Sequence, residues 1–122
     1  MNPHHKSRIK SFGHAIDGIG EALKTQFNFR LHVAAALLVT GAGLIFHIPA
    51  VEWCIVVLAI GLVAAAECFN TAMEYLTDLA MPEHHAVAGK IKDLAAGAVL
   101  ICAVAAAIAG LMVFVPRIAS FM

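Results

Sequence analysis

Three long apolar segments dominate this chain of 122 residues. They cover residues 31–48, 51–75 and 94–115, and the first reads LHVAAALLVTGAGLIFHI. A helix rises about 1.5 Å per residue, so about 20 apolar residues cross a hydrocarbon core of about 30 Å. We therefore expect three membrane-spanning helices. Pro49 is expected to end the first and Pro116 the third, because proline disfavours a continuing helix.

The composition supports a lipid environment for most of the chain. It is 61% apolar and 13% charged, with a mean hydropathy of +0.87, whereas soluble domains are about 45–50% apolar and 25% charged. A soluble domain of this length has too little interior to bury so much apolar surface. The chain therefore predicts one all-α membrane domain over residues 1–122. Its net charge of zero gives no field to attract nucleic acid.

Residues 4–28 differ from the apolar segments, because charged and apolar side chains alternate there with helical spacing. The apolar positions recur at steps of three and four: Ile9, Phe12, Ile16, Ile19, Leu23 and Phe27. This pattern predicts an amphipathic helix with too many charges to span a membrane. We expect it to lie in the interface, with its apolar face in the bilayer.

Basic residues predict the orientation of the chain in the membrane. They precede the first span, and Lys90 and Lys92 lie in the predicted polar loop, residues 79–93. By the positive-inside rule, the N-terminal helix and this loop face the cytoplasm.

The stretch AECFNTAMEYLTDL, residues 66–79, places acidic side chains at the end of the second apolar segment. At about 100° per residue, Glu74 lies about 20° from Glu67 around the helix, Asp78 about 20° on the other side, and Asn70 about 60° away. Ionisable side chains at membrane depth are functional candidates by default. Hydrogen bonding between spans is the alternative; it would account for Asn70 but not for a stripe of like charges.

A bound cation would remove the repulsion within this stripe. Magnesium binds carboxylate oxygens together with water and substrate phosphates. Lys90, Lys92 and Asp93 begin the third span at the same expected depth, where cationic groups can hold phosphates. The arrangement favours phosphoryl transfer to a lipid hydroxyl, and any ATP site is of a design other than the Walker loop, whose motif does not occur in the sequence.

These residues carry a resemblance to a known family. AECFNTAMEYLTDL followed by PEHHAVAGKIKDLAAGAVL resembles the signature of the prokaryotic diacylglycerol kinases, which include the undecaprenol kinases. The pattern is E-x-x-N-[ST]-A-x-E, then E-[YH]-H, then K-D-x-x-[AS]-A-x-V-L. The strings KSF at residue 10 and NFRLH at residue 28 favour the undecaprenol kinase branch.

The resemblance implies a homotrimeric helical bundle in the bacterial inner membrane, with sites that neighbouring protomers share on the cytoplasmic side. It implies that Glu67 accepts the proton of the lipid hydroxyl and that Glu74 binds Mg²⁺, while three residues support the site: Asn70, Asp78 and Arg30. The implied nucleotide-binding residues are Lys92 and Asp93, a lid with Glu83 and His85, and Arg8 or Lys10 from the N-terminal helix.

Position 26 departs from the family pattern. The family usually has a second metal-binding glutamate four residues before the arginine that matches Arg30, and this chain has Gln26 there. An amide oxygen can bind magnesium but brings no charge, so we expect activity with weaker metal binding.

Several functions therefore stay open from the sequence. The first is an ATP- and Mg²⁺-dependent kinase for undecaprenol or a similar polyprenol, and the alternative with the same chemistry uses diacylglycerol. A scaffold derived from an inactive kinase is favoured only by Gln26. An ion or proton carrier would not need Lys92 and Asp93 beside the acids.

Overall fold

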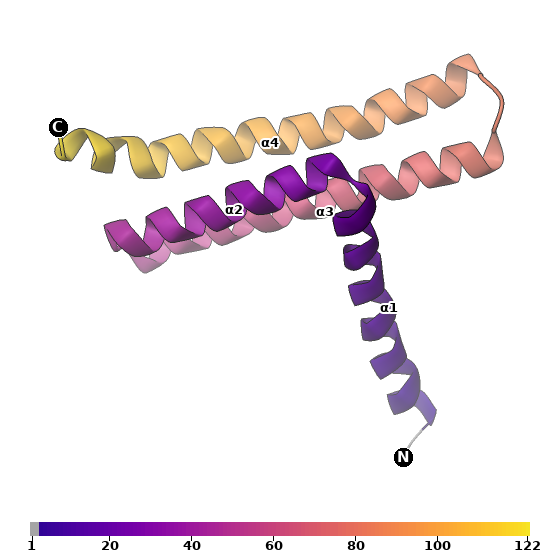
Figure 1. Cartoon of the computed structure of the whole chain (residues 1–122), viewed down its shortest axis with the longest axis horizontal. Helices are drawn as coiled ribbons and strands as arrows, with labels where there is room; N and C mark the ends of the chain where they lie inside the picture. Colours follow the sequence, from indigo (N-terminus) through magenta and orange to yellow (C-terminus); the bar gives the residue numbers. More distant parts are fainter. Residues whose placement is uncertain (1–2) are drawn as a thin grey trace.

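The computed structural model describes residues 3–122 and is helical throughout (Figure 1). Its helices are α1 (Pro3–Thr25), α2 (Phe27–Phe46), α3 (Ala50–Ala80) and α4 (Ala86–Ser120). The described residues contain no strand. Helices α2, α3 and α4 run alongside one another, and α1 leaves them at a steep angle so that its N-terminal end lies away from the bundle. The expected all-α class is confirmed.

Helices α2, α3 and α4 are each long and apolar enough to cross a membrane, as the three apolar segments predict. Many of their large apolar side chains are exposed in the single chain, as expected for surfaces that face lipid or other copies. With 31 residues in α3 and 35 in α4, these helices are about 46 and 52 Å long, and both exceed a hydrocarbon core of about 30 Å. The helix ends therefore do not mark the limits of the spans.

The N-terminal helix is shorter than the predicted 4–28 segment. Gln26 has an extended backbone (φ −109°, ψ 109°) and separates α1 from α2. The guanidinium of Arg30 donates from Nη1 to the carbonyl oxygens of Leu23 and Lys24, both at 3.0 Å. These bonds satisfy carbonyls that a helix end leaves without partners. The side chain of Arg30 thus stabilises a break that apolar periodicity alone does not reveal.

The best-packed region lies where α2 ends and α3 begins. Ile48, Val56 and Val113 are buried there, and Phe46, Trp53 and Phe114 pack around them. Helix α2 ends at His47, whose left-handed backbone (φ 52°) directs the chain into α3. Gly43 lies so close to Trp53 that an added Cβ would be 2.7 Å from the indole Cη2 atom. The absence of a side chain at residue 43 lets the two helices approach here.

The connection between α3 and α4 is residues 81–85, so the predicted loop over 79–93 is too long. Pro82 disfavours helical backbone at Met81, which ends α3. Helix α4 starts directly afterwards because the His85 side chain caps it: Nδ1 accepts a hydrogen bond from the Val87 backbone N–H at 3.0 Å. Residues 86–93, predicted as part of the loop, are therefore the first turns of a helix.

Pro116 does not end the last helix as predicted, because α4 continues through it to Ser120. A proline removes one backbone hydrogen bond, but its fixed φ is compatible with helix. Arg117 holds the following turn. Its Nη1 donates to the Val113 carbonyl at 2.7 Å, and its Nη2 forms an ion pair with Glu52 Oε2 of α3 at 2.5 Å.

Candidate active site

The centre of the candidate site is Glu67, a carboxylate buried between α2 and α3. It is only 3% exposed, on a helix whose neighbouring residues are mostly apolar. Its Oε1 atom lies 3.2 Å from Nε2 of His32, which comes from the second turn of α2. Burying a carboxylate is costly unless it is paired or hydrogen-bonded. His32 supplies that partner.

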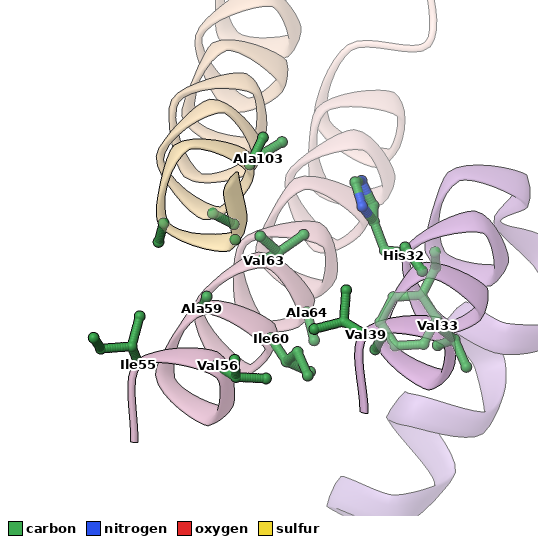
Figure 2. A pocket seen from close by; sticks show the side chains of 17 residues that line it. His32, Val33, Val39, Ile55, Val56, Ala59, Ile60, Val63, Ala64 and Ala103 are labelled. Carbon is green, nitrogen blue, oxygen red and sulfur yellow. The ribbon is translucent and has the colours of Figure 1, made fainter. Parts of the chain in front are cut away.

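His32 also borders an apolar cavity of about 260 Å³ between α2, α3 and α4 (Figure 2). In the close view, its imidazole reaches from α2 toward α3 at the edge of this cavity. The other lining residues are almost all aliphatic, and they include Val33, Val39, Val56, Ile60, Val63 and Ala103. The contact between Glu67 and His32 therefore lies at the border of an apolar cavity.

One turn after Glu67, an amide and a second carboxylate lie together. Asn70 Nδ2 donates to Glu74 Oε1 at 3.4 Å. The Oδ1 atom of Asn70 is buried, and no hydrogen-bond partner for it is found among the side chains that the structure describes. A buried carbonyl oxygen normally has a partner. Asn70 and Glu74 therefore offer adjacent oxygen ligands, which is the donor chemistry that Mg²⁺ prefers.

The described side chains of a single chain do not supply a full set of metal ligands. The described residues contain no group of three or more His, Cys, Asp or Glu side chains placed to hold an ion. Magnesium usually takes only one or two carboxylates and obtains its other ligands from water and phosphates. The pair Asn70 and Glu74 therefore fits a magnesium–nucleotide site of this kind.

The junction between α1 and α2 lies against the same part of α3. Tyr75 donates from its hydroxyl to Glu21 Oε1 at 3.3 Å and lies 3.4 Å from Thr25 Oγ1. Gln26 Nε2 donates to the same Thr25 hydroxyl at 3.3 Å. A chain of hydrogen bonds thus links Gln26 to the residue that follows Glu74.

Lys92 reaches the acidic stripe from α4. Its Nζ lies 2.6 Å from Asp78 Oδ1, and both side chains are substantially exposed. Asp93, the next residue, faces outward and borders an open hollow on α4 together with Lys90. The structure therefore brings Lys92 to the predicted stripe and leaves Asp93 away from it.

The other predicted nucleotide-binding residues lie apart from the carboxylates within one chain. Glu83 is exposed in the 81–85 connection, His85 caps α4, and Arg8 and Lys10 are exposed on the N-terminal half of α1. Figure 1 shows that this end of α1 points away from the bundle.

Sequence reasoning missed the partners that hold the site together. His32 was visible as an ionisable residue in an apolar segment, and that signal marks a functional candidate in a membrane protein. Tyr75 and Glu21 gave no such signal, because a tyrosine near the end of a long apolar helix and a glutamate on a charged helix are both ordinary. Their contact depends on how α1 turns at Gln26.

Comparisons with known proteins agree with these features. The chain is 43% identical to the undecaprenol kinase of Bacillus subtilis over 110 residues, which cover 90% of this chain and 89% of that protein. It is 38% identical to a diacylglycerol kinase of Synechocystis over 115 residues, 93% of this chain and 66% of that protein. It is 29% identical to the diacylglycerol kinase of Escherichia coli over 100 residues, 82% of each.

The family match covers most of the chain. Residues 13–114 match the family described as prokaryotic diacylglycerol kinase, and they include Glu67, the Asn70–Glu74 pair and Lys92. The three apolar helices and these bacterial relatives identify a bacterial membrane protein. The chain belongs to the prokaryotic diacylglycerol kinase family.

Proposed function

We propose that this protein is a membrane lipid kinase that transfers the γ-phosphate of ATP to the hydroxyl group of undecaprenol. The observation that carries the proposal is the buried Glu67, held by His32 at the edge of an apolar cavity. A carboxylate in this position is suited to accept a proton from an alcohol that comes from lipid. The 43% identity to the Bacillus subtilis undecaprenol kinase favours a polyprenol as that alcohol.

In the proposed transfer, Glu67 accepts the proton of the lipid hydroxyl. As the hydroxyl oxygen forms its bond to the γ-phosphorus, its O–H bond breaks and the proton moves to the free oxygen of the carboxylate. The bond between the γ-phosphorus and the bridging oxygen of ADP breaks at the same centre, so that ADP leaves. Glu67 then loses the proton to solvent before the next turnover. In phosphoryl transfer, the protein contributes mainly positioning and electrostatic stabilisation.

Asn70 and Glu74 are proposed to hold Mg²⁺ on the nucleotide, and Gln26 to contribute an amide oxygen. When bound, the ion neutralises charge on the phosphates. Support comes from the unpartnered Oδ1 of Asn70 and its contact with Glu74. Lys92 is proposed to exchange its contact with Asp78 for phosphate oxygens, which is feasible because that ion pair is exposed.

The remaining nucleotide contacts are proposed to come from a homotrimer with shared sites. Arg8, Lys10 and Asp93 are exposed in the single chain, so they are available to a neighbouring copy. Glu83 and His85 lie on the connection that precedes α4, the helix of Lys92, and are proposed to cover the nucleotide. The exposed apolar surfaces of α2, α3 and α4 are sufficient for contacts between protomers.

We place α1 in the interface on the cytoplasmic side of the bacterial inner membrane. Its apolar face is exposed, with Phe12 74% and Ile16 67% exposed, and no other described helix covers it. An interfacial helix buries such a face among lipid headgroups and acyl chains. The basic residues of α1 and of the start of α4 support the cytoplasmic orientation.

The test uses purified protein in bilayers with labelled ATP and Mg²⁺. Undecaprenol and diacylglycerol are supplied in separate vesicles, and lipid-extractable label is measured. We expect phosphorylated undecaprenol to form faster than phosphatidic acid, and chelation of Mg²⁺ to stop both. Faster labelling of diacylglycerol would reassign the substrate, whereas no labelled lipid from any long-chain alcohol would contradict the kinase proposal and favour a scaffold.

A further inference from the structure

We propose that His32 is a positioning residue that fixes the orientation of the Glu67 carboxylate for proton transfer. This inference rests on the proposed lipid kinase function. It adds His32 of α2 to a site whose proposed catalytic and metal-binding carboxylates, Glu67 and Glu74, lie on α3. The contact between His32 Nε2 and Glu67 Oε1, at 3.2 Å, is the starting observation.

The contact leaves one carboxylate oxygen for the substrate. Oε1 of Glu67 lies 3.2 Å from His32 Nε2, and no polar contact of Oε2 is found among the side chains that the structure describes. A carboxylate can rotate about its terminal torsion, which has broad minima. A polar partner held close to one oxygen restricts this rotation, so the other oxygen presents its lone pairs in a constant direction.

The surroundings make this role specific to His32. The Glu67 side chain is 4% exposed, whereas that of His32 is 29% exposed. The nearby Thr71 hydroxyl donates to the Glu67 backbone carbonyl rather than to the carboxylate. Among the side chains that the structure describes, His32 is therefore the polar partner found for the carboxylate.

The donor function does not depend on the charge of the imidazole. Nε2 carries a hydrogen both in the imidazolium ion and in the neutral tautomer that donates from this atom. A hydrogen bond to an ionised group is stronger than a neutral one, and an apolar surrounding strengthens it further. Removing the donor leaves a buried carboxylate beside an apolar cavity, where it is free to rotate away from the reacting hydroxyl.

The experiment compares His32→Leu with His32→Gln in the full-length protein. Leucine removes the donor, whereas the glutamine amide retains one. Loss of a polar contact to a charged group corresponds to about ten- to a hundredfold in rate, and we expect His32→Leu to lower kcat by that factor. The KM for Mg–ATP should change less than about twofold, since the variant keeps the contacts that bind Mg–ATP. His32→Gln should regain most of the lost kcat.

The matched control is His47→Asn, at the opposite end of α2. His47 has a left-handed backbone conformation, which asparagine tolerates, and it has no part in the proposed site. This variant should keep the wild-type kcat. If His32→Leu also keeps it, or if His32→Gln is as slow as His32→Leu, the positioning role is overturned.

A second measurement follows the contact without catalysis. In protein labelled with ¹⁵N-histidine, the Nε2 resonance of His32 should move when Glu67 is replaced by glutamine, and the His47 resonances should not. An unchanged His32 resonance overturns the proposal. If the wild-type protein phosphorylates no lipid alcohol, the kinase function fails and the catalytic role of His32 fails with it. Activity in the wild type with an unaffected His32→Leu variant overturns the positioning role alone.

Discussion

The two ends of the helical bundle are built differently. Where α2 ends and α3 begins, apolar side chains pack around Ile48, and the ion pair between Glu52 and Arg117 has side chains only 25% and 26% exposed. At the other end of α3, the Asp78–Lys92 pair is 63% and 41% exposed, and the nearby Asn70 retains a buried oxygen without a partner among the described residues.

We infer that the end of α3 near Glu52, the packed end, contributes mainly to stability. The end near Asp78, the open end, contributes mainly to function. The packed end pairs its carboxylate, Glu52, with a cation from α4, and its apolar side chains fix the spacing of the helices. The open end keeps acidic groups close together, which costs stability unless a ligand compensates. Where a protein leaves a buried polar group without a hydrogen-bond partner, that place is commonly a functional site. Substitutions at the two ends should therefore affect different measurements.

The largest expected effect is at the open end, from Glu67→Gln. The amide keeps the shape of the side chain and removes its capacity to accept the proton. General base catalysis contributes about 10²- to 10⁴-fold, so we expect lipid phosphorylation to fall by that factor. Sedimentation in detergent should give the wild-type oligomeric state, which for our proposal is a trimer. Retained turnover would contradict the assignment of Glu67, and loss of the oligomer would show that Glu67 has a structural role.

At the packed end, Gly43→Ala should lower stability and not the chemistry. The new methyl group would lie 2.7 Å from Trp53, and overpacking of this kind costs about 1–3 kcal/mol. Gly41→Ala is the matched control on the same helix, because a Cβ there meets nothing within 4 Å. Thermal unfolding in detergent should distinguish the two variants. Equal stability would mean that Trp53 moves aside freely and that this end is less rigid than described.

The ion pairs Glu52–Arg117 and Asp78–Lys92 provide a second test of the difference between the two ends of α3. Arg117→Gln leaves Glu52 three-quarters covered without its cation, and we expect a loss of about 1–2 kcal/mol in the free energy of unfolding. Asp78→Asn removes an exposed pair, for which about 0–1 kcal/mol is typical. The same unfolding assay applies. A greater loss for Asp78→Asn than for Arg117→Gln would reverse our assignment of the structural end.

The smallest expected effect is a gain. Gln26→Glu should lower the Mg²⁺ concentration needed for half-maximal activity by about fivefold, equivalent to about 1 kcal/mol, because a charged ligand binds the ion better than an amide. Asn28→Asp adds the same charge two residues away and serves as the control. An equal change in both variants would indicate a general surface charge effect, and no change would reject Gln26 as a metal ligand.

Much of the architecture follows from the sequence because a long apolar segment forms a helix that can cross a membrane. The three long apolar segments predict the three apolar helices, and Pro49 and Pro116 were the predicted boundaries. These signals failed where side chains compensate. Arg30 stabilises the break at Gln26, His85 starts α4 early, and Arg117 holds the turn after Pro116. Such contacts depend on tertiary geometry, which a single segment does not encode.

The candidate site was predictable in part for the same reason. Glu67, Asn70 and Glu74 lie on one helix, so their shared face follows from helical geometry alone. The contact of Lys92 with Asp78 required only that α3 and α4 be antiparallel neighbours. His32 and Tyr75 were not predicted, because their partners are on other helices. Asp93 was expected beside Lys92, but adjacent residues on a helix point in different directions.

The surplus length of α3 and α4 has a consequence for how two unlike reactants meet. Both helices are longer than the apolar thickness of a bilayer, and the last part of α3 and the start of α4 carry Glu74, Asp78 and the lysines. A water-soluble phosphate donor can stay in solution while a long-chain alcohol keeps its tail dissolved among the lipids, and the reacting atoms come together at the boundary between the two phases. Neither molecule has to be carried across or pulled out, so this small chain needs no transport machinery of its own.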